Sequence, residues 1–446
     1  MRLRSKIEKR RISILDVICM KKKRLTANIF RISHVLLHSE QYFLRSRMKS
    51  TDFTRKRKLG FVDYMTYLLS GVKISLQAGL NQYLDMRNRR NETYSKQAFS
   101  KGRERIRPEA FKELSDTVAL SVYPLAETST WNGYHLLAID GSRLNLPLHP
   151  ETEKDFGSQI TGGNPQPQAL CSCLLDVLNE LVIDARIGPC RDSERNHAKD
   201  MIRSLNTEIV HNPLYLMDRG YPSSELMAII EGLGQKYLMR CDKSFIRAIQ
   251  RDGNDVVVTH RFSKLEEPIE FRVITIKSKS TDGESETEDY LITNLLDDQY
   301  QLQDFVELYH LRWGIETKYN DLKNKLQIEN FTGITPVAIR QDFFATLYLV
   351  NLAGVLAIDY RDDIEAAHNT PENKRTYKLN VNLTIAALKQ DVVSLLLYRS
   401  PSDRDRLLFK IERRLKNAVV PIRPNRSYER KRKHDLLKHP SNTKLP

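Results

Sequence analysis

Residues 309–323 read YHLRWGIETKYNDLK, and four polar side chains in this segment recur at helical spacing. The four are Tyr309, Arg312, Glu316 and Lys323. Each residue of an α-helix advances about 100°, so all four fall within an arc of about 60° on one face. A lone carboxylate beside three side chains that bind phosphate predicts a metal ligand next to a polyanion.

An apolar stripe runs beside these polar residues, and it would bury the helix and turn the polar stripe toward a cleft. Its members are Leu308, Leu311, Ile315, Leu322 and Leu326. The alternative is an ordinary surface helix, in which Glu316 pairs with Arg312 at i,i+4 and Lys323 is solvated. The segment alone favours neither interpretation. Further carboxylates at strand ends would decide, because one Glu cannot hold a catalytic divalent ion.

Two aspartates follow short apolar runs. Asp140 ends the run in YHLLAIDGS, residues 134–142, and Asp218 ends the run in PLYLMDRG, residues 213–220. Each lies where a buried strand meets a turn, and each taken alone is explained by turn formation. Together with Glu316 they make three hard oxygen ligands, which suit Mg²⁺ or Mn²⁺.

The order Asp140, Asp218, Glu316 resembles that of the DDE transposases of bacterial insertion sequences. The contexts IDGS and MDRGY and the spacing Y-x2-R-x3-E-x6-K are similar to those of the cut-and-paste branch of that family. The resemblance covers about residues 50–360. It implies that the three carboxylates hold two Mg²⁺ ions, with Mn²⁺ as a substitute, and catalyse phosphoryl transfer on DNA.

The resemblance also implies the partners, which are double-stranded DNA at terminal inverted repeats, target DNA, and a second copy in a synaptic dimer. Phosphate contacts are expected from Tyr309, Arg312, Lys323 and Arg219. Two alternatives stay open. One is a host-adopted, non-catalytic DNA-binding protein, and the other is a structure-selective nuclease of the same fold.

Basic charge gathers at both ends of this 446-residue chain. Residues 1–60 hold 18 Lys and Arg against 4 Asp and Glu, and residues 401–446 hold 14 against 5. The formal net charge is +15, so the residues between the two ends are acidic in balance. Basic ends around an acidic centre are expected of a protein that binds DNA phosphates and a metal, although solvated or disordered tails would give the same composition.

The N-terminal third is predicted to hold a basic, irregular extension over residues 1–47 and a helical DNA-binding domain over residues 48–125. Ser95 is a plausible N-cap for a helix that carries many basic residues. Lys96, Lys101 and Arg103 of this helix are candidate DNA contacts. An ordinary solvated face is the alternative.

The central region predicts an α/β fold, because three strands are followed by strands that alternate with helices. The strands are predicted at 134–139, 169–177, 181–187, 214–218 and 236–241. The resemblance implies a ribonuclease H-like mixed sheet flanked by helices, with Asp140 and Asp218 adjacent across it. The catalytic core would occupy residues 126–241 and 298–365, followed by a helical and basic C-terminal region over residues 366–446.

Residues 242–297 separate the two halves of the core and read as a β-rich insertion. Related enzymes hold the DNA end there with an aromatic wedge that stabilises a flipped base. Neither Trp131 nor Trp313 lies in the insertion. Possible substitutes are Tyr237, Phe245 and Phe262. Trp313 itself is expected to be a core residue, with base stacking as the alternative.

The five cysteines show no C-x-x-C pair and predict neither a zinc site nor a disulfide framework. The apolar run 343–358 is too short for a bilayer span and is expected to be a buried helix that braces the site helix. A cytoplasmic, nucleoid-associated protein with no membrane contact is therefore expected.

Overall fold

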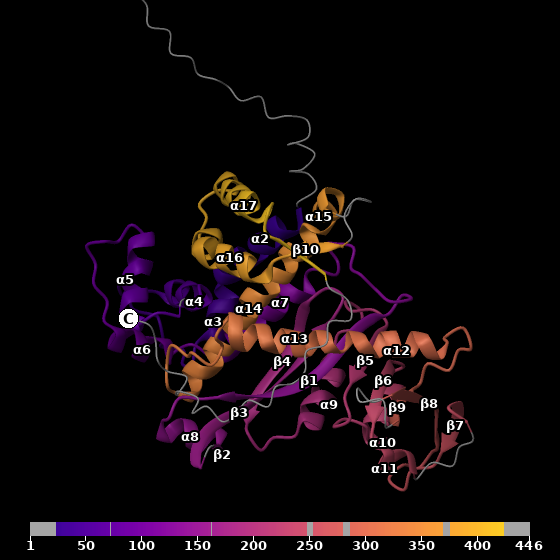
Figure 1. Ribbon diagram of the computed structural model, residues 1–446. Helices are drawn as coiled ribbons and strands as arrows, with labels where there is room; N and C mark the ends of the chain where they lie inside the picture. Colours follow the sequence, from indigo (N-terminus) through magenta and orange to yellow (C-terminus); the bar gives the residue numbers. More distant parts are fainter. Residues whose placement is uncertain are drawn as a thin grey trace, which may run out of the picture.

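Helices pack on both faces of a large mixed sheet in the computed structural model of the chain (Figure 1). The structure describes residues 24–71, 73–161, 163–247, 253–279, 286–368 and 375–422. The predicted α/β class is confirmed.

The centre of the sheet is β1 (His135–Asn145), which pairs antiparallel with β3 (Asn164–Asp176) and parallel with β5 (Pro213–Met217). The sheet order is β2-β3-β1-β5-β6-β9-β8-β7, and β4 also pairs with β3. The remaining strands of this sheet are β2 (Ser158–Thr161), β4 (Leu181–Pro189), β6 (Lys236–Cys241), β7 (Asp255–His260), β8 (Ile269–Lys279) and β9 (Glu286–Thr293). A separate pair joins β10 (Tyr377–Leu379) to β11 (Val419–Pro421).

The β-rich segment between the two halves of the core continues this sheet. Strand β9 pairs antiparallel with β6, and β8 and β7 follow it outward. Residues 242–297 are therefore rich in β-strands as predicted, and these strands extend the edge of the main sheet.

Successive side chains of a strand point to opposite faces, so the sheet separates two apolar cores. Leu136 and Ala138 of β1 belong to the larger core, whereas Leu137 and Ile139 belong to the smaller one. Strand β5 repeats this alternation. The face of the sheet toward which a side chain of β1 or β5 points therefore follows from its position in the alternating sequence of the strand.

Many helices contribute to the larger core, and they come from both ends of the chain. They are α2 (Arg24–Leu37), α3 (Glu40–Ser46), α4 (Phe61–Leu69), α5 (Leu76–Met86), α6 (Lys96–Arg103), α7 (Pro108–Leu120), α8 (Pro150–Phe156), α12 (Leu302–Leu311), α13 (Trp313–Asn320), α14 (Pro336–Asp359), α15 (Arg361–His368), α16 (Val381–Leu396) and α17 (Pro401–Leu415). The smaller core is covered by α9 (Glu194–Ser204), α10 (Ser224–Gly232) and α11 (Lys243–Arg247).

The apolar run 343–358 forms the middle of α14, which passes through the larger core. Among the described residues α14 is the one helix long and apolar enough to cross a membrane, but 89% of its most apolar window is buried within the protein. The prediction of a buried core helix is confirmed.

The prediction that residues 1–47 are irregular is wrong for the described part of that segment. Helix α2 packs against α7 and α14, and its Ile29 and Phe30 are fully buried. Basic residues dominate the composition here and mask a short apolar pattern in which Leu25 and Ile29 stand four residues apart. Residues 1–23 lie outside the described residues.

Candidate active site

Asp140 and Asp218 lie just beyond the point where the parallel strands β1 and β5 stop pairing with each other. The prediction that a strand ends at Asp140 is wrong, because β1 continues to Asn145 and Asp140 pairs with Cys173 of β3. The ladder between β1 and β5 ends at Ala138 opposite Leu216, so each aspartate stands two residues farther along the chain. Ala138 and Leu216 both face the larger core. Because side chains alternate, the two carboxylates belong to this same face.

The helical segment that carries the third carboxylate crosses this face in two pieces. In Figure 1, α12 and α13 follow one another across the sheet. Arg312 stands between them, and a π-helical turn η1 (Asp321–Lys325) continues α13. The predicted continuous α-helix is therefore interrupted at Arg312 and widened beyond Asn320. The predicted apolar stripe is buried except for Leu311, which is half-buried.

Gly314 allows α13 to approach the sheet closely. A Cβ atom at this position would lie 2.6 Å from Cγ1 of Val177, far inside van der Waals contact. Val177 follows β3 directly. A glycine two residues before Glu316 therefore determines how near the site helix lies to the strands.

Three polar contacts fasten the helical segment to β1. The Tyr319 hydroxyl donates to the Asp140 carbonyl oxygen at 2.7 Å, and the Lys323 ammonium donates to the Arg143 carbonyl oxygen at 2.8 Å. Beyond the helix, Glu329 Oε1 accepts from the backbone N–H of Asn145 at 2.9 Å. These contacts fix the position of the helical segment relative to β1.

Tyr309 and Arg312 each contact one of the carboxylates. The Tyr309 hydroxyl donates to Asp218 Oδ1 at 3.2 Å, and Arg312 Nη2 donates to Glu316 Oε1 at 2.7 Å. The Arg312 guanidinium carbon lies 5.6 Å from the centre of the Tyr309 ring. Tyr309 and Arg312 therefore lie between Asp218, which follows β5, and Glu316 on α13.

Asp140 lies within electrostatic reach of the same groups. The pKa of the Asp140 carboxyl is raised to about 6, mainly by burial and to a smaller extent by the negative charges of Glu194 and Glu316. The backbone N–H of Gly141 and the cation of Arg312 act in the opposite direction on this pKa. A buried carboxyl that is costly to ionise among like charges is typical of functional sites.

The donor chemistry of this site fits a divalent ion such as Mg²⁺. Asp140, Asp218 and Glu316 offer only carboxylate oxygens, which are the ligands that Mg²⁺ and Mn²⁺ prefer. As they stand, no three His, Cys, Asp or Glu side chains among the described residues are close enough together to hold an ion. Arg312 supplies positive charge to the carboxylates in this arrangement.

Arg219 takes part in a basic pair at the edge of the site. Its Nη2 donates to Asp289 Oδ1 at 2.8 Å, and Arg240 also contacts that carboxylate. Arg219 is exposed, so a DNA contact by this residue stays a prediction. The Lys323 ammonium is half-buried against β1, and its phosphate contact also stays a prediction.

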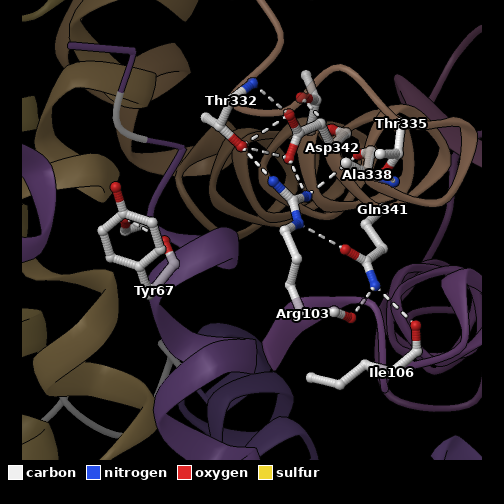
Figure 2. Close-up of polar contacts among 10 residues, drawn as sticks. Tyr67, Arg103, Ile106, Thr332, Thr335, Ala338, Gln341 and Asp342 are labelled. Atoms are coloured by element: carbon white, nitrogen blue, oxygen red, sulfur yellow. Dashed lines mark hydrogen bonds and ion pairs between the residues drawn. The ribbon is translucent and has the colours of Figure 1, made fainter. Parts of the chain in front are cut away.

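The prediction that Arg103 contacts DNA is wrong in this structure, because the side chain is buried. Figure 2 shows its guanidinium among Thr332, Gln341 and Asp342 of the larger core. Its side chain is 1% exposed, and Nη2 lies 2.7 Å from Asp342 Oδ1. Arg103 therefore ties α6 to α14.

The other basic candidates of α6 remain accessible. Lys96 and Lys101 are both exposed, and the predicted N-cap is confirmed, since the Ser95 side chain accepts from the Ala98 backbone N–H. Their contact with DNA stays a prediction.

The burial of Trp313 and of Tyr237 differs from what the sequence predicts. Trp313 is 48% exposed and packs against His310 with ring centres 5.4 Å apart, so its expected core role is wrong. Tyr237 is fully buried and cannot act as a wedge in this structure. Phe245 and Phe262 are half-buried and lie 5.8 Å apart between ring centres.

Comparisons with known proteins identify the family of the chain. The family described as "Transposase DDE domain" matches residues 131–352, a span that contains Asp140, Asp218 and Glu316. "Transposase InsG for insertion sequence element IS4" of Escherichia coli (strain K12) is 25% identical over 319 residues, which cover 67% of this chain and 70% of the relative. The chain belongs to the DDE transposases of bacterial insertion sequences.

Among solved structures, a piggyBac transposase synaptic complex with hairpin DNA is similar at a TM-score of 0.42 and 11% identity. The similarity covers 90% of this chain and 85% of that chain. A likeness at this level carries no argument about the site.

Proposed function

We propose that the chain is a cut-and-paste transposase that binds the terminal inverted repeats of its element and catalyses DNA strand cleavage and strand transfer. The observation that carries the proposal is the grouping of Asp140, Asp218 and Glu316 around Arg312, beside the point where β1 and β5 stop pairing. The order of three antiparallel strands followed by parallel ones supports a ribonuclease H-like core. Such a protein works in the cytoplasm, on nucleoid DNA.

The three carboxylates are the groups that would hold Mg²⁺ or Mn²⁺. Divalent ions bound there, two in the mechanism we favour, would activate a water or a DNA 3′-hydroxyl as the nucleophile and would stabilise negative charge on the leaving 3′ oxygen. Asp140 lies in β1, Asp218 directly follows β5, and Glu316 lies on a helix bonded to β1, so secondary structure fixes the backbone positions of all three.

Arg312 and Tyr309 are the groups that would position a phosphate of the DNA end. Arg312 is 3% exposed, and its Nε has no hydrogen-bond partner among the described residues. A buried donor without a partner is unfavourable, and a DNA phosphate would satisfy it. Tyr309 reaches the same space from one turn earlier on the chain and offers a single hydroxyl.

DNA outside the catalytic centre would be held by the exposed basic residues. Lys96 and Lys101 of α6 and Arg219 beside the site are accessible to phosphates. The proposed organisation assigns residues 48–125 to DNA binding and residues 126–365 to the catalytic core with its β-rich insertion. A second copy of the chain in a synaptic dimer completes the proposal.

An assay with the DNA that flanks this reading frame tests the proposal. The purified full-length chain is mixed with fragments that carry the flanking inverted repeats, a target plasmid and Mg²⁺. We expect nicks at the repeat ends and joined products, both of which disappear with EDTA. Cleavage at DNA junctions without preference for the repeats would favour a structure-selective nuclease. Tight binding without any cleavage would favour a non-catalytic DNA-binding protein.

A further inference from the structure

Glu194 lies against the strand that carries Asp140. It is the first residue of α9, where the Ser193 side chain caps the helix by accepting from the Asn196 backbone N–H. A Cβ atom built on Gly141 would lie 2.4 Å from Glu194 Cδ and 2.7 Å from its Oε1. The Glu194 carboxylate therefore fills the space beside Gly141, one residue after Asp140.

Glu194 approaches from the opposite face of the sheet to Glu316. By alternation Gly141 faces the smaller core, which α9 covers, whereas Asp140 faces the larger core and α13. Strand β5 pairs with β1 only as far as Ala138. Past Ala138, β1 stays paired with β3 but no longer pairs with β5. Carboxylates from both faces can therefore approach Asp140 along this edge of β1, and the charges of Glu194 and Glu316 both act on it.

Glu194 forms no ion pair with a cation among the described residues. The Glu194 carboxylate accepts a hydrogen bond from the buried Tyr221 hydroxyl at 3.4 Å. No Lys, Arg or His of the described residues makes an ion pair with it, and the Nε of neighbouring Arg195 donates to a backbone carbonyl. The negative charge of Glu194 acts unfavourably on the buried Asp140 carboxylate, and a divalent cation between the two would remove this repulsion.

We infer that Glu194 is a fourth carboxylate ligand of the divalent-metal site, acting together with Asp140. The inference rests on the proposed function, since it concerns the same metal site. It assigns this role to a residue outside the Asp140, Asp218 and Glu316 set. Gly141 is then required because any side chain there would displace Glu194.

Metal binding by the full-length protein without DNA tests the role of Glu194 directly. The variant Glu194→Gln keeps the size of the side chain and removes its charge, and isothermal titration calorimetry measures the affinity for Mn²⁺. We expect an affinity about 10-fold or more below that of the wild type, in the range reported for altered metal-site residues. Glu208→Gln, at an exposed position beyond α9, is the matched control and should bind Mn²⁺ as the wild type does. Wild-type affinity in Glu194→Gln would overturn the inference.

A second variant displaces Glu194 without changing any carboxylate. Gly141→Ala places a methyl group on Glu194, so we expect a loss of Mn²⁺ affinity similar to that of Glu194→Gln. Combined with Glu194→Gln, the alanine should cause little further loss, because both changes remove the same contact. Additive losses in the double variant would contradict the assignment. Circular dichroism and thermal unfolding check that each variant folds.

The failure of this inference can be told apart from the failure of the proposed function. Retained DNA cleavage by Glu316→Gln would remove the whole metal-site assignment. Loss of cleavage in Glu316→Gln, together with wild-type Mn²⁺ affinity in Glu194→Gln, would remove only the role of Glu194.

Discussion

Arg312 and Glu316 form an ion pair in which the cation is buried and the acid is not. Their atoms lie 2.7 Å apart, with the Arg312 side chain 3% and the Glu316 side chain 39% exposed. Pairs at i,i+4 on an open helix surface contribute only a few tenths of a kcal/mol. A buried guanidinium instead fixes the position of the carboxylate and lends it positive charge where no metal is bound.

Replacing Arg312 is expected to separate metal affinity from catalysis. Arg312→Ala removes a cation that acts on Asp140, Asp218 and Glu316, so Mn²⁺ should bind the DNA-free protein more tightly than it binds the wild type. Cleavage should nevertheless fall by about 10-fold or more, because a phosphate contact is lost. Calorimetry and a gel cleavage assay measure the two effects. Weaker Mn²⁺ binding together with unchanged cleavage would contradict this role for Arg312.

Asp140 should destabilise the folded protein at neutral pH when metal is absent. Burial raises its pKa to about 6, above the unfolded value, so its stabilising contribution is present at low pH and is lost as the pH rises through about 6. Asp140→Asn should therefore increase the free energy of unfolding in EDTA by on the order of 2 to 3 kcal/mol at pH 8 and by roughly half of that at pH 5.

Urea titrations at the two pH values measure the effect of Asp140→Asn. Asp200→Asn, at an exposed position on α9, serves as the control and should show no such pH-dependent gain. A loss of stability in Asp140→Asn at pH 8 would show that the carboxylate is not electrostatically strained.

Arg103 should matter for stability rather than for DNA affinity. Arg103→Ala leaves Asp342 buried without its cation, which typically costs about 3 to 5 kcal/mol. Thermal and urea unfolding measure this cost. Lys101→Ala, on the same helix but exposed, should unfold like the wild type. An Arg103→Ala protein of normal stability but reduced DNA affinity would restore the original DNA-contact hypothesis.

Lys96 and Lys101 are expected to contact DNA through phosphates without reading the sequence. Replacing both by Ala should weaken binding to any duplex and reduce the slope of log affinity against log salt by about 2. Fluorescence anisotropy across a salt series measures the slope. Gln97→Ala, an exposed neutral change on α6, controls for the helix itself. An unchanged slope in the double variant would show that this face of α6 stays in solvent.

Features set by local sequence could be predicted, and features set by distant packing could not. Apolar runs and turn residues predict Asp140 and Asp218 at strand ends, which is correct for Asp218, directly after β5. It is wrong for Asp140, because β1 continues past Gly141 by pairing with β3, a distant part of the chain. The DNA contact predicted for Arg103 is wrong because the burial of this side chain depends on Asp342, 239 positions away in the chain. The bond from Tyr319 to the Asp140 carbonyl, across 179 positions, was missed for the same reason.

The buried N-terminal helix α2 and the carboxylate of Glu194 show two further limits. In α2 the basic composition outweighed a short apolar pattern, although Ile29 is fully buried. No sequence periodicity indicates a role for Glu194, because Glu194 comes close to Gly141 and Asp140 only when α9 packs on the sheet. The signal that could have found it is the IDGS motif, whose glycine marks a close approach.

The central claim is that Glu316 completes a metal site for DNA cleavage, and one comparison tests it most directly. Glu316→Gln is assayed beside the wild type and Glu307→Gln, an exposed control on α12, with repeat-end DNA in Mg²⁺ and in Mn²⁺. We expect all three proteins to bind the DNA end, and cleavage by Glu316→Gln to fall by on the order of 10³-fold or more while the control cleaves normally. Cleavage by Glu316→Gln at the wild-type rate in either metal would contradict the account.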